Sequence, residues 1–302
     1  MLRNLSYDLH LHTHWSYDAF NSLESCFQHA RSRGVRCIAV TDHMVLDGAD
    51  RLEEAGRGYP DVRAIPAAEF TVSTPHRSRV DLLCFGLQRD DSGLLAGVLE
   101  IYRDFQRETG EARWKGLDAL GLDVTGEDYL QLLRSYRPAT VVDVQGVTDC
   151  QIDVWLGFLR GRGLISSPDE LRPLMERMEE KVSVPPFPGV ESVVPPLKQS
   201  GALVALAHPY RYVGGDEAMI DAYVETCQAD GMECAHGSVP PELTPRYRQY
   251  CIGHGLFSTG GSDAHDERDL RINFARHHGE EEWLDEFLER LERKRDAGRS
   301  GG

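Results

Sequence analysis

Short apolar runs alternate with helical patterns through the first third of the chain. The runs predict strands at 6–12, 35–41, 62–70 and 79–86, and the segments between them predict helices near 22–33 and 47–57. Ser22 is placed to cap the first helix, and Gly34 is placed to end it. This alternation indicates strands that are joined through helices.

The pattern changes between about 93 and 184, where helical periodicity dominates. Helices are predicted over 94–113, 126–134, 153–162 and 167–181, and none of these segments ends in a residue that resembles a metal ligand. We therefore expect 93–184 to be an inserted helical subdomain, with the proline-rich stretch 184–188 as its exit.

Alternation returns from 191 to the C-terminal end of the chain. A helix from 191 is followed by strands at 202–207, 231–235 and 256–260 and by helices at 216–230, 240–254 and 280–295. We expect residues 1–92 and 185–295 to form one barrel domain. The small polar residues of 296–302 predict a disordered tail.

The first predicted strand carries an unusual concentration of histidine. His10, His12 and His14 alternate along it, and Asp18 follows a few residues later. Alternate side chains of a strand share a face, so the three imidazoles can point toward one place. Imidazole and carboxylate groups suit zinc, manganese or iron. An edge strand with solvated histidines would show the same local pattern. The choice between a metal site and an edge strand therefore depends on motifs elsewhere in the chain.

Four further apolar runs end in a potential ligand. They close with Thr41-Asp42-His43, Ala67-Ala68-Glu69-Phe70, Ala207-His208-Pro209 and Ser262-Asp263-Ala264-His265. The carboxyl ends of successive strands are where a βα barrel forms its active site. Five such coincidences favour a metal site at the mouth of a barrel over an edge strand.

Composition restricts the partners of this site. The 302 residues include 33 basic and 49 acidic ones, and the net charge of −16 disfavours a long nucleic acid as a partner. A phosphorylated small molecule stays compatible with this charge, because bound cations can reverse the sign inside a pocket.

Other features of the chain point to the cytoplasm. No apolar stretch approaches the roughly 20 residues that cross a bilayer, and the N-terminal residues lack the apolar core of a signal peptide. The seven cysteines are scattered without a Cys-x-x-Cys pair, which is typical of buried thiols in a reducing compartment. We expect a cytoplasmic protein without a membrane partner.

Taken together, these motifs resemble the polymerase and histidinol phosphatase (PHP) family of metal-dependent phosphoesterases. The matching pieces are DLHLH at 8–12, TDH at 41–43, the glutamate of AAEF at 67–70, AHP at 207–209 and GSDAH at 261–265. The resemblance implies an α/β fold, a distorted TIM-like (β/α)7 barrel, with two to three divalent ions (Mn²⁺, Fe²⁺ or Zn²⁺) in its mouth. The helical insert and the segment 231–236 resemble the branch that dephosphorylates nucleotides and trims RNA 5′ ends.

The same resemblance assigns ligands to three ions. The first ion would take His10, His12, Glu69 and Asp263, and the third would take Asp18, His43 and His265. The second ion would share Glu69 and take His208 with a ligand from the strand after the glutamate. One or two of these residues could instead orient true ligands.

One departure from the family concerns the second ion. The family usually has a histidine before the Leu-Leu of the strand after the glutamate, and this chain has Asp81 there. A carboxylate can ligate the same metals, so Asp81 is our candidate, with a weaker or missing second ion as the alternative. His76 is a less favoured substitute.

A second departure concerns the spacing of Asp18. It lies six residues after His12, as in the histidinol phosphatase type, whereas the nucleotide branch commonly has five and this chain has Tyr17 there. Asp18 is our candidate ligand, and His14 is the alternative.

A third departure limits the prediction of a substrate. The branch commonly carries Arg-Pro-His in its insert, and the aligned residues here are Ile152-Asp153-Val154. Four arginines are candidates to replace this phosphate-binding element: Arg137, Arg160, Arg162 and Arg211. We select Arg211, which follows the AHP motif, and Arg160 for substrate binding. His236 ends a predicted strand and is a candidate for substrate contact or proton donation.

The resemblance implies a phosphoric ester hydrolase that attacks a phosphomonoester of a small metabolite or nucleotide with a metal-activated water. Glu69, Asp263 and His236 would be its catalytic residues. The chain has neither a glycine-rich phosphate loop nor a Gly-x-Ser-x-Gly motif, which agrees with this chemistry. The alternatives are a 5′–3′ exonuclease on short RNA or DNA ends, a histidinol-phosphatase-like enzyme, and a regulatory barrel that has lost its metal.

Overall fold

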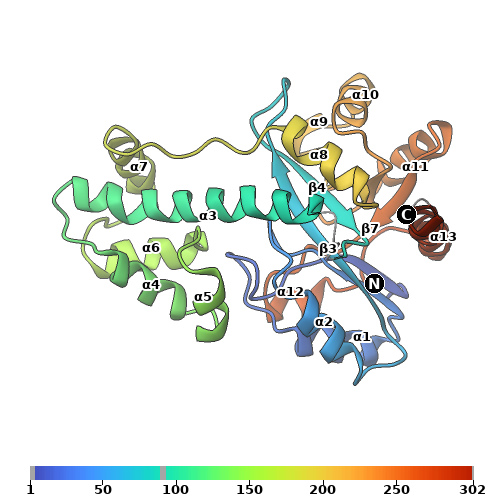
Figure 1. The fold of residues 1–302 in the computed structure, drawn as a ribbon, viewed down its shortest axis with the longest axis horizontal. Coiled ribbons are helices and arrows are strands. Elements are labelled where there is room, and N and C mark those ends of the chain that lie inside the picture. The colour runs from blue at the N-terminus through green and yellow to red at the C-terminus, as the bar shows by residue number, and fades with distance from the viewer. Residues whose placement is uncertain (1–3, 89–92, 301–302) are drawn as a thin grey trace.

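Seven strands cross the centre of the molecule in the order of the sequence (Figure 1). The computed structural model describes residues 4–88 and 93–300. The strands are β1 Tyr7–Leu11, β2 Cys37–Val40, β3 Arg63–Val72, β4 Val80–Phe85, β5 Leu203–Leu206, β6 Gly231–Ala235 and β7 Phe257–Gly260. Most of their residues are buried on both faces, as expected for strands that helices cover.

The sheet nearly closes into a barrel where β1 approaches the residues after β7. The Asp263 amide donates to the His10 carbonyl (2.9 Å), and the His12 amide donates to the Ala264 carbonyl (3.1 Å). These bonds fix the histidines of β1 beside the GSDAH segment. The expected α/β fold with a distorted (β/α)7 barrel is confirmed.

Strand β4 runs opposite to its neighbours. It pairs antiparallel with β3 and with β5, whereas the other neighbouring strands pair in parallel. Its first residues therefore lie at the end of the barrel where the other strands finish. Asp81 stands opposite Thr71 in this register, so the start of β4 contributes to the mouth.

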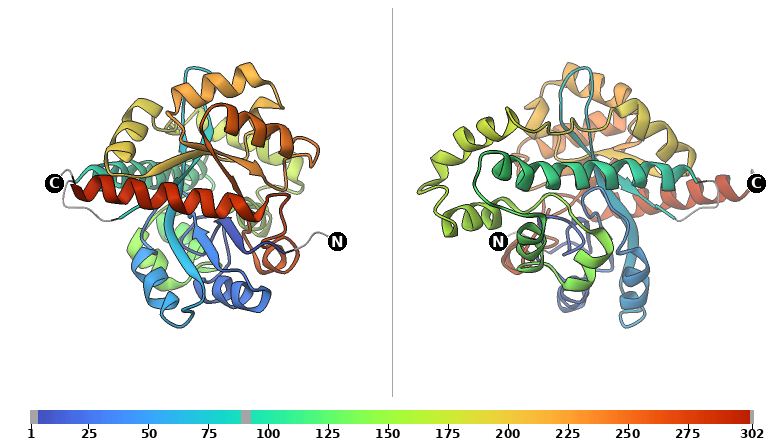
Figure 2. Two further views of the ribbon diagram at one scale, coloured as in Figure 1. Left: turned by 90° about the vertical axis from the view of Figure 1, so that its right-hand side faces the viewer. Right: turned by 60° about the vertical axis from the view of Figure 1, so that its left-hand side comes forward.

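Eight helices of the described chain surround the barrel (Figures 1 and 2). They are α1 Leu23–Arg33, α2 Ala49–Gly56, α8 Val190–Gln199, α9 Tyr210–Val213, α10 Glu217–Thr226, α11 Thr244–Gly253, α12 Glu267–Ile272 and α13 Glu281–Ser300. In α1, the Ser22 hydroxyl accepts the Ser25 amide, and Gly34 ends the helix at φ 70°. Both predicted cap positions of this helix are confirmed.

The middle of the chain forms a helical layer beside the barrel, at the left of Figure 1. Its elements are α3 Leu94–Ala119, α4 Gly126–Arg134, α5 Ala139–Gln145, α6 Ile152–Gly161, a 3₁₀ turn Pro168–Glu170 and α7 Leu171–Glu179. These helices bury their own hydrophobic cluster around Tyr129 and Trp155, separate from the barrel core. We call this layer, residues 93–184, the insert.

Two expectations about the elements need correction. Helix α13 continues to Ser300, so 296–300 is helical and not a disordered tail, while 301–302 lie outside the described residues. Alanine, arginine and lysine near this end favour continuation of the helix. The short helices α5, α9 and α12 were not predicted, because four to seven residues carry too little periodicity.

Among the residues that the structure describes, no helix combines the length and apolar character needed to cross a membrane.

Candidate metal centre

A cavity of about 630 Å³ opens at the mouth of the barrel. Its walls include Asp18, His43, Glu69, His208, Asp263 and His265. Each of these residues lies in or just after a strand, or in the loop that follows β1. The topology therefore brings together residues that are up to about 250 positions apart in the sequence, as is usual for the active face of such a barrel.

Four side chains converge on one point beneath this cavity. His10 Nε2 lies 3.1 Å from His12 Nε2 and 3.2 Å from Glu69 Oε2. Asp263 Oδ1 lies 3.3 Å from His10 Nε2 and 3.2 Å from His12 Nε2. Ligand atoms bound to one ion at about 2.1 Å stand about 3.4 Å apart in a tetrahedron. The spacing of this first group fits a divalent transition-metal ion.

A second group uses the other oxygen of Glu69. Glu69 Oε1 lies 3.1 Å from His208 Nε2, and Asp81 Oδ2 lies 3.9 Å from the same nitrogen. The Thr71 hydroxyl donates to Asp81 Oδ1 at 2.6 Å, which orients the carboxylate and leaves Oδ2 toward His208. The three ligand atoms of Glu69, Asp81 and His208 lie within 4.8 Å of one another.

A third group forms around Asp18. Asp18 Oδ2 lies 3.4 Å from His43 Nε2 and 3.6 Å from His265 Nε2, and His12 shares a ligand cluster with these histidines. Asp18 Oδ1 is buried and has no hydrogen-bond partner within the described part of the chain. A buried carboxylate oxygen without a partner is costly, and a cation there would satisfy it. The donor sets of all three groups thus fit divalent ions.

The backbone is strained at two of these positions. His208 has φ 28° and Asp263 has φ 54°, in the left-handed region that residues other than glycine rarely adopt. Such strain persists where the surrounding structure enforces it, and it concentrates at functional sites. The strain turns both side chains out of strand geometry at the ends of β5 and β7.

Protons balance the charge of the cluster when no metal is bound. Burial favours neutral His43, but the carboxylates of Asp18 and Glu69 raise its pKa to about 10. Burial opposes the charge on His265 as well, and Asp18 raises its pKa to about 9. Burial would raise the pKa of Glu69, yet His10 and His43 hold it well below its usual range. Metal binding would replace these protons.

Glu233 supports the first group from behind, and sequence reasoning did not identify it. Its Oε1 lies 3.0 Å from His10 Nδ1, and its Oε2 accepts the His208 amide at 2.8 Å. A carboxylate on the far nitrogen of a histidine fixes the ring for metal binding through the other nitrogen. Its signal in the sequence is a lone glutamate in the buried strand β6.

His236 also lies behind the ligands and is 4% exposed. The Ser238 amide donates to His236 Nδ1 at 2.9 Å, so the proton of the neutral ring is on Nε2. Nε2 then donates to Asp263 Oδ2 at 3.3 Å. This arrangement turns the ring toward Asp263 and does not place it on the cavity wall.

The insert holds the loop that carries Asp18. The Tyr136 hydroxyl donates to the Tyr17 carbonyl at 2.5 Å. Arg137, 2% exposed, donates through Nε to the His14 carbonyl at 3.2 Å and also bonds Gln145. These contacts tie the α4–α5 corner to residues 14–17, next to the third group.

Three arginines line the mouth cavity: Arg79, Arg113 and Arg211. Arg211 Nη2 lies 3.3 Å from Asp263 Oδ2, and its role in substrate binding stays a prediction. Arg79 and Arg113 were not predicted. Arg160 is exposed on α6 and is not among the residues of this cavity.

The remaining alternatives lie elsewhere in the described structure. Arg162 pairs with Asp128 inside the insert, and Arg137 serves the loop contacts above. His76 is exposed in the β3–β4 hairpin, and the His14 ring lies near Trp15, so neither joins a ligand cluster. Ile152 lines the cavity and is 47% exposed.

Comparisons with known proteins agree with this geometry. The chain is similar over 94% of its length to a presumed metal-dependent phosphoesterase from Bifidobacterium adolescentis, with 23% identity, 96% of that chain covered and a TM-score of 0.68. It is also similar to an amidohydrolase from Chromobacterium violaceum, with 20% identity, 91% of each chain covered and a TM-score of 0.66. At these identities the likeness concerns the fold. A search of curated proteins finds no match.

The PHP domain model matches residues 8–181, which is more than half of the chain. This stretch contains β1 from Asp8 onward, the strands β2 to β4 with their ligand-like residues, and the insert up to residue 181. The family that the motifs resemble is thereby confirmed: the chain belongs to the PHP domain family.

Proposed function

We propose that this PHP domain is a metal-dependent phosphoesterase that hydrolyses a phosphomonoester of a small metabolite or nucleotide. The observation that carries the proposal is the position of Glu69. Its two oxygens face the histidines of different ligand groups, at 3.2 Å for His10 and 3.1 Å for His208. A carboxylate in this position would bridge two ions in the way that hydrolytic two-metal sites require.

The first group would hold one ion through His10, His12, Glu69 and Asp263. Glu69, Asp81 and His208 would hold a second, and Asp18, His43 and His265 a third. Bound divalent ions supply an acidified water and neutralise phosphate oxygens. The chain itself fixes the ligand geometry through Glu233 and His236, and we assign His236 as a positioning residue for Asp263.

The rim of the cavity supplies additional positive charge for a phosphate. Arg79 and Arg211 are about half exposed and lie beside Asp81 and Asp263, and Arg113 pairs with Asp149 at 2.9 Å. Phosphoryl transfer depends mainly on positioning and on charge neutralisation, and arginine suits both. We propose that Arg79 and Arg211 contact the phosphate.

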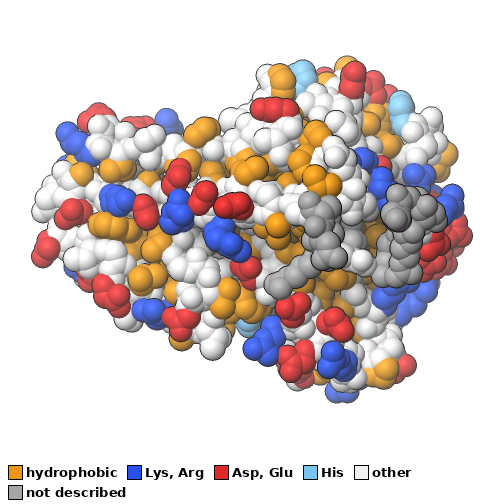
Figure 3. Space-filling view, in the orientation of Figure 1, with side chains coloured by type: hydrophobic (Ala, Val, Ile, Leu, Met, Phe, Trp, Pro, Cys, Tyr) orange, Lys and Arg blue, Asp and Glu red, His pale blue; other side chains and the backbone are white. Residues whose placement is uncertain are grey.

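The surface favours a small substrate over a long nucleic acid. The net charge is −16, and on the face shown in Figure 3 acidic and basic side chains of the described residues are mixed, without a continuous basic band. A nucleic acid that gained its affinity from the phosphate backbone would need such a band. We propose small phosphomonoesters as the substrate class.

An assay on the metal-reconstituted protein tests this proposal. We expect release of phosphate from p-nitrophenyl phosphate and from members of a phosphorylated metabolite panel, with EDTA abolishing turnover. A 5′-labelled oligoribonucleotide serves as the parallel substrate. Faster trimming of the oligonucleotide than of any small ester would favour the exonuclease, and no hydrolysis with Mn²⁺, Fe²⁺ or Zn²⁺ would contradict the proposal.

A further inference from the structure

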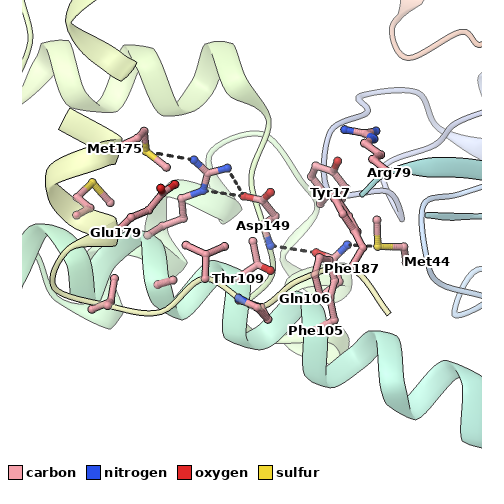
Figure 4. A pocket seen from close by; sticks show the side chains of 16 residues that line it. Tyr17, Met44, Arg79, Phe105, Gln106, Thr109, Asp149, Met175, Glu179 and Phe187 are labelled. Atoms are coloured by element: carbon pink, nitrogen blue, oxygen red, sulfur yellow. Dashed lines mark hydrogen bonds and ion pairs between the residues drawn. The ribbon is translucent and has the colours of Figure 1, made fainter. Parts of the chain in front are cut away.

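A second cavity, of about 260 Å³, lies between α3, α7 and the segment that follows α7 (Figure 4). Phe105, Phe187, Met44 and Tyr17 form one side of it, and Met175 lies on the other side. Arg113 also lines the cavity and bonds both Asp149 and the Met175 sulfur. We call this cavity the apolar slot. Its lining of aromatic rings and thioethers differs from the polar mouth cavity.

The apolar slot borders the mouth cavity. Tyr17, Arg79, Arg113 and Asp149 line both. The Tyr17 ring also stacks on His43, with 5.5 Å between the ring centroids. A substrate that spans this border at Tyr17 would have its phosphate at the metal groups and its leaving alcohol in the slot.

One polar group within the slot lacks a partner. Thr109 is 8% exposed, and its hydroxyl makes no hydrogen bond within the described residues. The side-chain carbonyl of nearby Gln106 accepts the Asp149 amide at 3.1 Å. Its side-chain amide donates to the Met44 sulfur at 3.4 Å, and thioether sulfur is a weak acceptor. A buried hydroxyl without a partner is costly unless a ligand completes it.

We propose that the apolar slot binds a flat apolar ring on the leaving alcohol of the substrate, with one hydrogen-bonding substituent that reaches Thr109. This inference rests on the proposed phosphoesterase function. A cavity of about 150 Å³ already binds benzene, so 260 Å³ accommodates a substituted ring. Methionine sulfur and aromatic faces make favourable contacts with such a ring.

The lining favours a carbocyclic ring over a nucleobase. A nucleobase presents several donors and acceptors, and each needs a partner when it is buried. The buried hydroxyl of Thr109 is free for a ligand, and Arg79 and Glu179, which also line the slot, are exposed to solvent. The Arg113 guanidinium is paired with Asp149 at 2.9 Å and lies 5.8 Å from the Trp155 ring centroid. Arg113 is therefore not free to pair with a buried nucleobase.

A series of esters tests the slot without a change in the reacting bond. Ethyl phosphate, 2-phenylethyl phosphate and 2-(4-hydroxyphenyl)ethyl phosphate have similar leaving alcohols and differ in the ring. We expect kcat/KM to rise roughly 10- to 100-fold from the ethyl to the phenylethyl ester, from burial of the ring. The hydroxyl should add roughly 2- to 10-fold through Thr109. Adenosine 5′-monophosphate is included to test whether the slot prefers a nucleobase.

Two variants locate the effect in the slot. Ala112 lines it on α3 and is 6% exposed, so Ala112→Phe should fill it and reduce the phenylethyl-to-ethyl ratio at least about tenfold. Ala119→Phe, on an exposed position of the same helix, is the matched control and should keep the wild-type ratio. Thr109→Val should remove the advantage of the hydroxyl and keep that of the ring.

Binding of 2-phenylethanol by ligand-observed NMR gives a readout that does not need turnover, and thermal unfolding checks the fold of each variant. Saturable binding that Ala112→Phe removes and Ala119→Phe keeps supports the slot. Equal kcat/KM for ethyl and phenylethyl phosphate, or a preference for the nucleotide over both ring esters, overturns it. If no ester is hydrolysed but 2-phenylethanol binds as described, the proposed function fails and the slot stands. If Ala112→Phe unfolds, the phenylethyl-to-ethyl ratio of the wild-type protein and the Thr109→Val variant still test the slot.

Discussion

The mouth of the barrel and the insert border the same cavity, but they place their side chains by different means. At the mouth, His10, His12 and Asp263 stand on or beside strands that share backbone hydrogen bonds, so sheet register sets their spacing. In the insert, Arg113 and Thr109 lie on one long helix whose position depends on side-chain packing.

This difference separates two tasks. Groups that must hold an ion tolerate little displacement, and strand ends provide that rigidity. Groups that select a substrate can vary with the packing of helices and loops, where new specificity is easily built. We infer that the barrel mouth determines the chemistry and the insert determines the selection of the leaving group.

The strongest challenge to the barrel mouth is Glu69→Gln. The substitution removes a charge that faces histidines of more than one ligand group, so metal content should fall. Activity should drop by more than about a hundredfold, beyond the effect typical of groups that only orient ligands. Arg211→Ala, a half-exposed residue on the same cavity, should cost less. Equal losses in steady-state kcat/KM would contradict a bridging role for Glu69.

The next largest effect concerns Asp81 and the second group. Asp81→Ala should lose one ion and most of the activity, because only two protein ligands, His208 and Glu69, would remain for that ion. Asp81→His should retain the ion and shift the preference away from manganese, since imidazole is a softer ligand than carboxylate. Metal analysis of both variants measures this. Unchanged metal content in both would remove Asp81 from the site.

The contact between the two regions is tested by Arg137→Met. Loss of its bonds to the His14 and Trp15 carbonyls should loosen the loop that carries Asp18 and weaken the third site roughly 10- to 100-fold. Arg134→Met is the matched control, because Arg134 pairs with Asp143 on the surface of the insert. Competitive metal titration compares the two. Identical titrations of both variants would show that the insert does not position the third site.

The smallest expected effect is the release of protons when the third group binds its ion. His43 and His265, with pKa values raised to about 10 and 9, are protonated in the metal-free protein near pH 7.5 and must lose these protons to bind an ion. Calorimetry in two buffers should show release of about two protons at this site. A histidine whose pKa is higher in the folded than in the unfolded protein stabilises the folded state. This contribution is complete below the unfolded pKa of 6.5 and is lost as the pH rises to 9–10. The metal-free protein should thus lose stability progressively between about pH 6.5 and pH 10, and a flat profile over this range would argue against this pairing.

Much of the barrel could be predicted because its signals are local. Apolar runs that end in His43, Glu69, His208 and Asp263 identify both the strands and the side of the barrel to which their ends point. The reversed direction of β4 is not visible in its composition, yet Asp81 could be assigned through the resemblance to the family.

The remaining features arise from packing between distant segments. Arg79 and Arg113 are ordinary arginines in the sequence, and only the approach of α3 to the barrel brings both to one cavity. Arg160 is exposed on α6 and is not among the arginines that line the mouth. Glu233 had a signal, a single charge in a buried strand, but its partner His10 is 223 residues away.

The most direct test of a shared metal centre at the barrel mouth is metal stoichiometry. We expect two to three equivalents of a first-row transition metal per chain by inductively coupled plasma mass spectrometry, after reconstitution with manganese, iron or zinc and removal of excess ions. The same measurement on Glu69→Gln should give at least one equivalent fewer. A wild-type value below one equivalent with every metal, or an unchanged value in Glu69→Gln, would contradict the account.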